Sequence, residues 1–463
     1  MLVSVAAALV ASPGDACPSL AISAAQLNRF EATDAAFVPK GFSISDVRRS
    51  LDGSSCAPVT QDGVAQGEES RCTDLGMSRS SPALVAAGAL SPLEFLPSPA
   101  GIERRRAPEW GTFAAKLQVR LERQQLQGAH SGCGLAGAPP WRAMYFVNTV
   151  PLIGFGSVLE YGMLYLARAT HMRSQLVFGH DSSRAWTSQW ACGAERSLNC
   201  YFNVSSCCGV LTLGGEGGRP VELSRRRNPV SIGLPGFNSF GSVWVSGQLA
   251  HYFFSRMTAA TRAAVDQRRA NVLPRRLTSL DPSPRFQCIG MHIRGGDACF
   301  ASRFCPANLT ASFFGTAARL RERYGLRRIV LATDSAPAAA LCASGVLGFE
   351  CHTLQMVRSK FESATFIEKR VARHEEGQLS GSAVALDALA DIDMLADCDA
   401  FVLVLRSAIS RLVYALALAR KGRPLPVISL QNPTSPGFLK QRRKAQYLKA
   451  SKVMPGRLKS KFY

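Results

Sequence analysis

Residues 328–335 read Arg-Ile-Val-Leu-Ala-Thr-Asp-Ser, an apolar run that ends in a carboxylate and a hydroxyl. Similar apolar runs occur at residues 286–293, 349–353, 401–405 and 426–430. Helical patterns separate them, at residues 309–324, 336–344, 383–397 and 407–420. Apolar runs that alternate with helices are typical of parallel strands joined by right-handed βαβ crossovers. Residues 284–435 are therefore predicted to form an α/β lobe with a doubly wound parallel sheet.

The rest of the chain divides into segments that differ in amino-acid composition. At 463 residues it is too long for one ordinary core, and residues 140–283 are expected to form a second, N-terminal lobe. Residues 1–139 are rich in Ala, Ser, Pro and Gly and are interpreted as a stem or linker, with one possible helix over 105–127. Residues 436–463 form a basic tail.

Charge and hydropathy exclude several classes of protein. The chain carries 54 Lys and Arg against 33 Asp and Glu, a net charge of +21, but Lys contributes only 11. A diffuse basic surface and a face for phosphate-bearing partners both fit this balance, whereas no nucleic-acid-binding motif is present and no nucleic-acid partner is predicted. No apolar run approaches the ~18 residues of a membrane span. Membrane association stays open, because the short apolar stretch Leu2–Ala11 fits either a weak signal segment or a misassigned start.

The cysteines and two sequons favour the secretory lumen of the Golgi or endoplasmic reticulum. Among the 14 cysteines, three pairs are close enough for small disulfide loops: Cys192 with Cys200, Cys299 with Cys305, and Cys342 with Cys351. No cysteine spacing fits a zinc site. Asn203 and Asn308 each begin an N-glycosylation triplet, as expected of a secretory protein.

A Gly-x-Gly turn opens the first helix of the predicted N-terminal lobe. Gly154 and Gly156 precede a helical pattern over residues 157–169. Such a turn allows backbone N–H groups to approach a phosphate, and a plain tight turn explains it equally well.

The residues at the strand ends carry the candidate chemistry, because ligands of doubly wound sheets bind there. His292 and Arg294 are two apart and share one face of a strand. His292 could bind a base or sugar while Arg294 holds a diphosphate. Alternatively, Arg294 pairs with Asp297 and His292 packs in the interior. Asp334 is either a helix cap or a ligand-facing carboxylate.

A third cluster precedes and follows the strand at residues 401–405. Asp391 and Asp393 are spaced like a metal-binding DxD motif, but two carboxylates two apart on a helix diverge, which argues against a metal site. Ser407 begins the next helix, where its hydroxyl and the helix N–H groups could hold a terminal phosphate; a simple helix cap is compatible with that role.

Taken in order, these motifs resemble a known family. They are His292-x-Arg294-x-x-Asp297, the strand ending in Asp334, Asp391-Ile392-x-x-Leu395 with Cys398-Asp399-x-Phe401, and Ser407-x-x-x-Arg411. They are similar to those of the α1,6-/protein O-fucosyltransferase superfamily, nearest the α1,6-fucosyltransferases and their algal and protist relatives. The resemblance covers about residues 140–430. It implies a GT-B fold of two Rossmann-like lobes, GDP-fucose in the cleft, inversion at the sugar, and no metal or other cofactor.

The resemblance also implies roles for individual residues. His292 and Asp391 would recognise guanine, and Arg294, assisted by Ser407, would hold the β-phosphate and stabilise the departing GDP. Gly154 and Gly156 would lie near the nucleotide. Asp297 and Asp334 match carboxylates that support the site.

This sequence departs from the family pattern at several positions. Gly295 stands where a second arginine is common, Ala298 replaces a lysine, Ser302 falls where a base is proposed, and Ala408 replaces a glutamine. We hypothesise that Arg406 supplies the missing positive charge. The base is unassigned, with Asp297 as the one candidate. The sequence predicts a basic tail from Lys440 to Lys461 in place of the C-terminal SH3-like module of the vertebrate enzymes.

The sequence thus predicts a fucosyltransferase that acts on a glycan or glycoprotein, and leaves open a catalytically silent GDP-sugar-binding relative with a scaffolding role.

Overall fold

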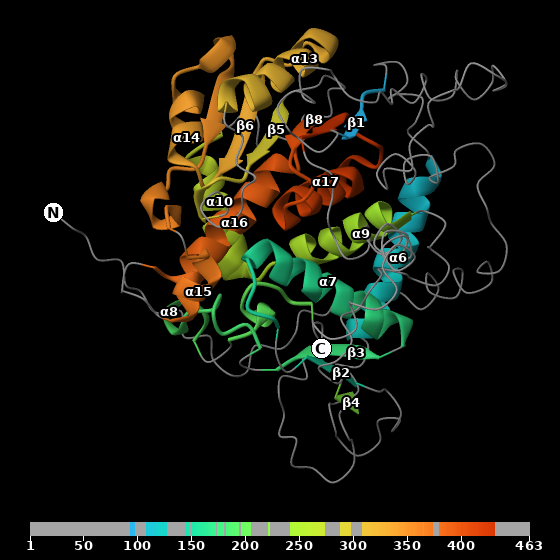
Figure 1. Ribbon diagram of the computed structural model, residues 1–463. Coiled ribbons are helices and arrows are strands. Elements are labelled where there is room, and N and C mark those ends of the chain that lie inside the picture. The colour runs from blue at the N-terminus through green and yellow to red at the C-terminus, as the bar shows by residue number, and fades with distance from the viewer. Residues whose placement is uncertain are drawn as a thin grey trace, which may run out of the picture. The chain divides into compact units, whose positions relative to one another are not determined.

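The computed structural model of the 463-residue chain divides into two compact units, residues 1–38 and 39–463. All residues that it describes belong to the second unit (Figure 1). These are residues 93–97, 108–126, 144–147, 150–172, 174–179, 182–193, 196–204, 221–222, 241–273, 288–297, 308–363, 365–373 and 379–430.

The larger sheet has six strands in the order β1-β9-β8-β5-β6-β7. They are β1 (Leu93–Phe95), β5 (Ile289–Ile293), β6 (Arg328–Thr333), β7 (Glu350–Thr353), β8 (Ala400–Leu403) and β9 (Val427–Ser429). All neighbouring pairs are parallel except β1 with β9. The five parallel strands run outward from β5 in both directions, so the chain order reverses between β5 and β8. This topology confirms the predicted α/β fold with a doubly wound parallel sheet and is consistent with GT-B.

The two faces of this sheet have separate cores. Alternate residues of β6 point to opposite faces, as the period of a strand requires: Ile329 and Leu331 belong to one buried cluster, Val330 and Ala332 to the other. The first cluster includes residues of the π-helical turn η3 (Thr310–Phe314), α13 (Gly315–Tyr324) and α14 (Ala336–Ala343). The second includes residues of α16 (Gly381–Leu395) and α17 (Ala408–Lys421). The predicted helices are thus confirmed to within a few residues.

A smaller parallel sheet and its helices lie in the N-terminal part. The sheet order is β3-β2-β4, with β2 (Met144–Val147), β3 (Gln175–Phe178) and β4 (Val221–Glu222). The larger helices here are α6 (Pro108–Leu126), α7 (Phe155–His171), α9 (Gly241–Ser255) and α10 (Ala259–Ala270). The shorter helical segments among the described residues are α8 (Gln189–Cys192), η1 (Leu198–Cys200), η4 (Val346–Gly348), η5 (Arg358–Phe361) and α15 (Ile367–Ala372).

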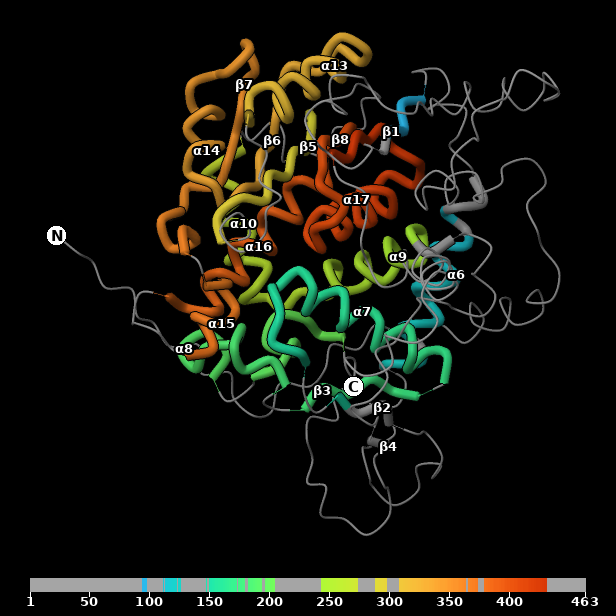
Figure 2. Tube along the Cα trace, in the orientation of Figure 1, coloured from blue at the N-terminus to red at the C-terminus, as the bar shows by residue number. Residues whose placement is uncertain are grey.

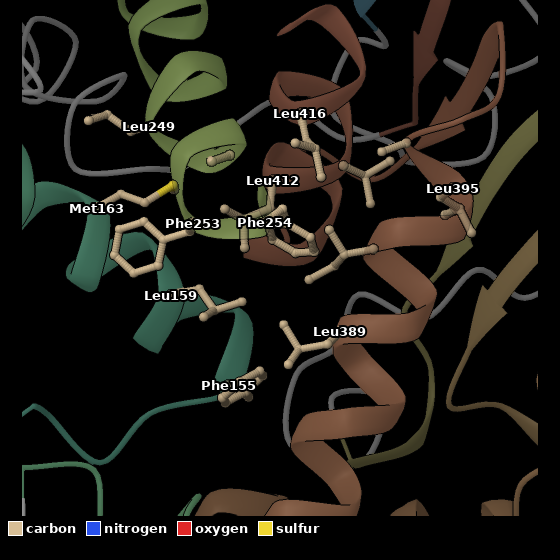
Figure 3. Packing of buried hydrophobic residues seen from close by; sticks show 14 of the residues in the cluster. Phe155, Leu159, Met163, Leu249, Phe253, Phe254, Leu389, Leu395, Leu412 and Leu416 are labelled. Atoms are coloured by element: carbon tan, nitrogen blue, oxygen red, sulfur yellow. The ribbon is translucent and has the colours of Figure 1, made fainter. Parts of the chain in front are cut away.

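Helices far apart in the sequence share one core. Figures 1 and 2 show α17 beside α7 and α9, and residue contacts join all three. Figure 3 shows Phe155 and Leu159 of α7, Phe253 of α9, Leu389 of α16 and Leu412 of α17 directed into the same interior. This continuous apolar core fixes the start of α7 against the start of α17, which matters for the site described below.

Two elements of the predicted stem belong to the folded unit. β1 extends the large sheet, and Leu117 and Leu121 of α6 are fully buried. Gln125 of α6 accepts a 2.8 Å hydrogen bond from the N–H of Leu176. The helix possible over residues 105–127 is therefore present, and the stem does not run unbroken to residue 139. The remainder of that segment, and the basic tail, lie outside the described residues.

Three disulfides are formed among the described cysteines. Two are the predicted short loops, Cys192–Cys200 and Cys342–Cys351. The third, Cys288–Cys398, spans 110 residues and ties the residue before β5 to the loop before β8. The predicted pair of residues 299 and 305 lies outside the described residues. No described helix is both long and apolar enough to cross a membrane.

Candidate active site

The candidate site lies where β5 and β8 end side by side. β5 is central and is flanked by β6 and β8, and the order of the parallel strands reverses between β5 and β8. His292 and Arg294 lie at the carboxyl end of β5, and Ser407 follows β8. A doubly wound sheet has its ligand crevice at such a reversal, so the fold brings these sequence-predicted residues to the expected edge.

His292 lies inside the protein and is neutral. Its side chain is 4% exposed, and Nδ1 lies 2.6 Å from the Ser410 hydroxyl. Burial, with a contribution from the Arg294 charge, lowers the pKa of His292 to about 3. The same Ser410 oxygen accepts a 3.2 Å hydrogen bond from the N–H of Val404. His292 therefore holds the start of α17 against β5, which is the interior role that the sequence left open; its predicted contact with guanine stays a prediction.

Arg294 is oriented by two carboxylates. Nη2 donates to Asp297 at 2.6 Å, and Nη1 donates to Asp334. The Asp297 side chain is fully buried, and its other oxygen accepts a 2.6 Å hydrogen bond from the N–H of Ile367. The second oxygen of Asp334 accepts from the N–H of Gly295 at 2.6 Å.

These contacts define how the two carboxylates are held. Both oxygens of Asp297 are engaged and buried, so its geometry is that of a positioning residue, not of a base that meets an acceptor. Asp334 orients Arg294, while the neighbouring Ser335 caps α14 by accepting from the N–H of Ala338 at 3.3 Å. The Arg294 side chain remains 28% exposed, and its guanidinium has further N–H groups to offer an anion.

Asp391 is a buried carboxylate with an unused oxygen. It lies on α16 and is 8% exposed, and Oδ1 has no hydrogen-bond partner among the described residues. Burial and the nearby Asp387 raise the pKa of Asp391 well above its ordinary value, against the opposing charge of Arg358. A buried polar atom without a partner is uncommon in folded proteins, and it fits a site that a ligand's N–H donors complete.

Asp393 faces different partners from Asp391. Its carboxylate pairs with Arg269 and Arg420, and Arg262 lies 3.4 Å away. The two carboxylates of this Asp-x-Asp motif therefore diverge, as expected on a helix. No group of three or more potential metal ligands is found in the described part of the chain.

Arg358 is a site residue that sequence reasoning missed. It begins η5, just after β7, and its guanidinium donates to the carbonyl of Thr333 at 3.2 Å and to the Thr353 hydroxyl at 2.9 Å. Its charge acts on Asp391, and burial lowers the pKa of Arg358 itself. Arg358 therefore links the ends of β6 and β7 to the Asp391 carboxylate. Neither periodicity nor a motif marked it, because it follows its strand in a loop.

Ser407 occupies the cap position of α17 without capping it. Its hydroxyl makes no hydrogen bond to the helix N–H groups, while its own N–H donates to the carbonyl of Val404 at 2.8 Å. The Ser407 hydroxyl thus stands at a helix N-terminus, where the helix dipole favours an anion.

The start of α7 meets the start of α17. A Cβ atom added at Gly156 would lie 2.7 Å from Cγ1 of Ile409 and 3.1 Å from its backbone nitrogen. Gly156 is therefore required for the close approach of the two helices. No described atom lies within 4 Å of a Cβ atom added at Gly154, so that glycine borders open space. Two helix N-termini consequently converge beside Ser407.

The close approach of Ser335 explains why a glycine stands at position 295. A Cβ atom there would lie 2.7 Å from Cβ of Ser335, so a side chain at this position would require Ser335 to move. The proposed substitute, Arg406, lies in the loop before α17, and its carbonyl accepts a 2.7 Å hydrogen bond from Arg411. Its compensating role stays a prediction. Residues 298 and 302 lie outside the described residues.

Known proteins resemble this chain only distantly. No family model and no curated protein matches the chain. Among solved structures, it is similar to the fucosyltransferase NodZ from Bradyrhizobium at 16% identity, covering 63% of this chain and 96% of that one, with a TM-score of 0.33. It is also similar to NodZ alpha-1,6-fucosyltransferase co-crystallised with GDP, with 16% identity, the same coverage and a TM-score of 0.36. These values are too low to transfer a site or an activity to this chain.

Proposed function

We propose that this protein is a glycosyltransferase that moves fucose from GDP-fucose to a hydroxyl of a glycan or glycoprotein, with inversion and without a metal. The sequence motifs indicate GDP-fucose as the sugar donor. The structure supports the proposal through the residues at the ends of β5, β6 and β8.

The unpartnered oxygen of Asp391 is the observation that carries the proposal. Guanine presents adjacent N–H donors on one edge, and a carboxylate accepts such a pair side by side. The buried Oδ1 atom of Asp391 lacks a donor among the described residues, and bound guanine would supply it. Adenine and uracil do not present this pair of donors, so the proposal includes selectivity for GDP.

The diphosphate is assigned to Arg294 and the converging helix N-termini. The exposed part of the Arg294 guanidinium would fork onto phosphate oxygens, and the Ser407 hydroxyl with the first N–H groups of α17 would hold the terminal phosphate. As the bond from sugar to phosphate breaks, negative charge develops on GDP. These fixed donors stabilise that charge, which is the role that a metal ion plays in other transferases.

A turnover assay tests the proposal. Purified protein is incubated with GDP-fucose and a panel of N-glycan acceptors, and the release of GDP is measured. We expect turnover on at least one acceptor and its loss in Arg294→Ala. Arg327→Ala, which removes an exposed arginine of the same lobe, is the matched control and should retain turnover. An Arg294→Ala variant as active as wild type would refute the assigned role.

A second candidate is a catalytically silent GDP-sugar-binding relative. It is favoured by the packing of Gly295 against Ser335, where a second arginine would require Ser335 to move. It predicts calorimetric binding of GDP without turnover on any acceptor of the panel.

We also propose that the protein works in the lumen of the secretory pathway. Disulfides and two exposed sequon asparagines, Asn203 and Asn308, support this proposal. A shift in gel mobility on treatment with peptide-N-glycosidase would be expected for protein made in that pathway. An unchanged mobility would count against use of these sequons.

A further inference from the structure

A pocket of about 450 Å³ lies at the loop between β2 and α7, the segment that leads into Gly154. Its walls are the loop from β2 to α7, including Pro151 and Leu152, the turn that begins at Ser182 and Ser183, and Ala372 at the end of α15. The volume lies within the ~300–1,000 Å³ typical of small-molecule sites. The wall formed by Pro151 and Leu152 is apolar, and the wall formed by Ser182 and Ser183 carries hydroxyl groups. This combination suits a sugar ring, which has apolar faces and a polar edge.

Two hydroxyls in this lining have no hydrogen-bond partner in the described part of the chain. Ser182 and Ser183 are 3% and 5% exposed, and neither Oγ atom has a hydrogen-bond partner among the described residues. Their backbone groups, by contrast, are paired: the Ser182 carbonyl accepts from the N–H of Val150 at 2.8 Å, and the Ser183 N–H donates to the carbonyl of Arg196 at 3.0 Å. The turn is thus held by its backbone, which leaves both side chains for a ligand that donates and accepts hydrogen bonds.

Both walls of the pocket lead to the candidate donor site. The β2–α7 loop continues into Gly154, where the two helix N-termini converge. α15 begins at Ile367, whose N–H binds Asp297, and ends at Ala372 in the pocket. A helix of this length spans about 8 Å, so the pocket lies one short helix away from the partner of Arg294.

Glu368 lies on α15, within electrostatic range of Asp297 and Arg294. It is four residues before Ala372, so both lie on the same face of α15. Its carboxyl group is half-buried and accepts a hydrogen bond from its own backbone N–H. The charged groups that act on it are Asp297, Arg294 and Lys369. Burial, reinforced by Asp297, raises the pKa of Glu368, which brings this carboxyl closer to the range of a general base.

We propose that this pocket binds the acceptor saccharide through Ser182 and Ser183, and that the Glu368 carboxylate takes the proton from its attacking hydroxyl. The inference rests on the proposed transfer from GDP-fucose. In the step, the acceptor oxygen forms a bond to the anomeric carbon of fucose, and its proton passes to Glu368. The bond from that carbon to the β-phosphate breaks, and GDP leaves with the electron pair. Asp297, with both oxygens engaged, holds Arg294 and the start of α15 in place.

The hydroxyls are tested with the double variant Ser182→Ala/Ser183→Ala. Because neither hydroxyl has a hydrogen-bond partner among the described residues, we expect the thermal midpoint and the Kd for GDP to stay at the wild-type values. The KM for the acceptor should rise roughly tenfold or more. The probes are the members of the N-glycan panel that wild type turns over. An unchanged acceptor KM would remove the pocket from acceptor binding.

Glu368 is tested with Glu368→Gln, and Glu362→Gln, at an exposed glutamate shortly before α15, is the control. We expect kcat to fall about 10²- to 10⁴-fold in Glu368→Gln, with the Kd for GDP unchanged. The acidic limb of the kcat–pH profile should also be lost, which a purely structural role would not produce. Wild-type kcat in Glu368→Gln, or an unaltered profile, would overturn the assignment.

The acceptor pocket and the proposed transfer from GDP-fucose can be disproved separately. If wild type binds GDP and turns over an acceptor while the pocket variants match wild type, the inference about the pocket is wrong and the proposed function stands. If wild type does not bind GDP, both are wrong.

Discussion

Arg411 donates two hydrogen bonds of 2.6 Å to the two carboxylate oxygens of Glu160, and this pair joins α17 to α7. The same guanidinium donates to the carbonyls of Leu405 and Arg406, at 3.0 and 2.7 Å. It therefore fixes the loop that carries Ser407 and sets the start of one helix beside the other.

This bidentate pair should be important for stability. Glu160→Gln replaces a charged acceptor by a neutral one in a pair that is only partly exposed. We expect it to lower the free energy of unfolding by about 1–3 kcal/mol. Chemical denaturation measures the change, with the exposed Glu362→Gln as a control of unchanged stability. Equal denaturation midpoints for wild type and Glu160→Gln would show that the pair of Glu160 and Arg411 contributes nothing to stability.

Alanine substitutions at Gly154 and Gly156 should have different effects, the first on the affinity for GDP and the second on the stability of the fold. Gly156→Ala places a methyl group against Ile409, so we expect a loss of about 1–3 kcal/mol of stability. Gly154→Ala places it in open space at the converging helix N-termini, so stability should be retained while GDP affinity falls. Thermal unfolding and calorimetric titration of GDP measure the two effects. The reverse pattern, with Gly154→Ala the less stable protein, contradicts this assignment.

His292 should make the fold sensitive to acid. Its pKa is lowered to about 3 by burial and by Arg294, whereas in the unfolded chain it is near 6.5. Between these values the unfolded chain binds the proton that the folded protein rejects, so stability is lost as pH falls below about 6.5. His292→Gln removes this contribution and should flatten the pH dependence of the unfolding free energy between pH 6.5 and 4. His251, whose pKa burial also lowers, is retained in both proteins. Parallel curves for the two proteins would argue against a neutral, buried His292.

The Cys288–Cys398 disulfide should stabilise the fold more than Cys342–Cys351. The first closes a loop with a sequence separation of 110 residues and the second one of 9. In the chain-entropy description, their removal costs about 5 and about 3 kcal/mol respectively. Double Cys→Ala variants of each pair, compared by denaturant titration, measure the difference. A larger loss for the Cys342–Cys351 pair would contradict the expected order.

Much of the sheet could be predicted from the sequence because its strands are short, buried and separated by helices with clear periodicity. The predicted strand and helix over residues 401–420 correspond to β8 and α17, and Ser407 lies at the helix start as expected. In the same way, the divergence of Asp391 and Asp393 follows from helix geometry.

Contacts between distant segments could not be predicted in this way. The role of Asp334 depends on Arg294, 40 residues earlier, and the packing of Gly156 depends on Ile409 in another helix. Arg358 and Glu368 lie in short helices after loops, where no periodic pattern marks them. The membership of β1 in the large sheet could not be predicted either, because this strand contributes few residues and pairs with the distant β9.

Asp391 provides the most direct test of the proposed function. Its Oδ1 atom has no partner among the residues that the structure describes, and burial raises its pKa, so Asp391→Asn should fold with stability equal to or above that of wild type at neutral pH. The side-chain amide would nevertheless present a donor where guanine also donates.

The decisive measurement is calorimetric titration of wild type and Asp391→Asn with GDP, and of wild type with UDP. Asp266→Asn, at an exposed carboxylate on α10, serves as the matched control. We predict that wild type and Asp266→Asn bind GDP in preference to UDP, and that Asp391→Asn binds GDP roughly 10- to 100-fold more weakly. Equal GDP affinity in wild type and Asp391→Asn, or no preference of wild type for GDP over UDP, would contradict the proposed guanine site.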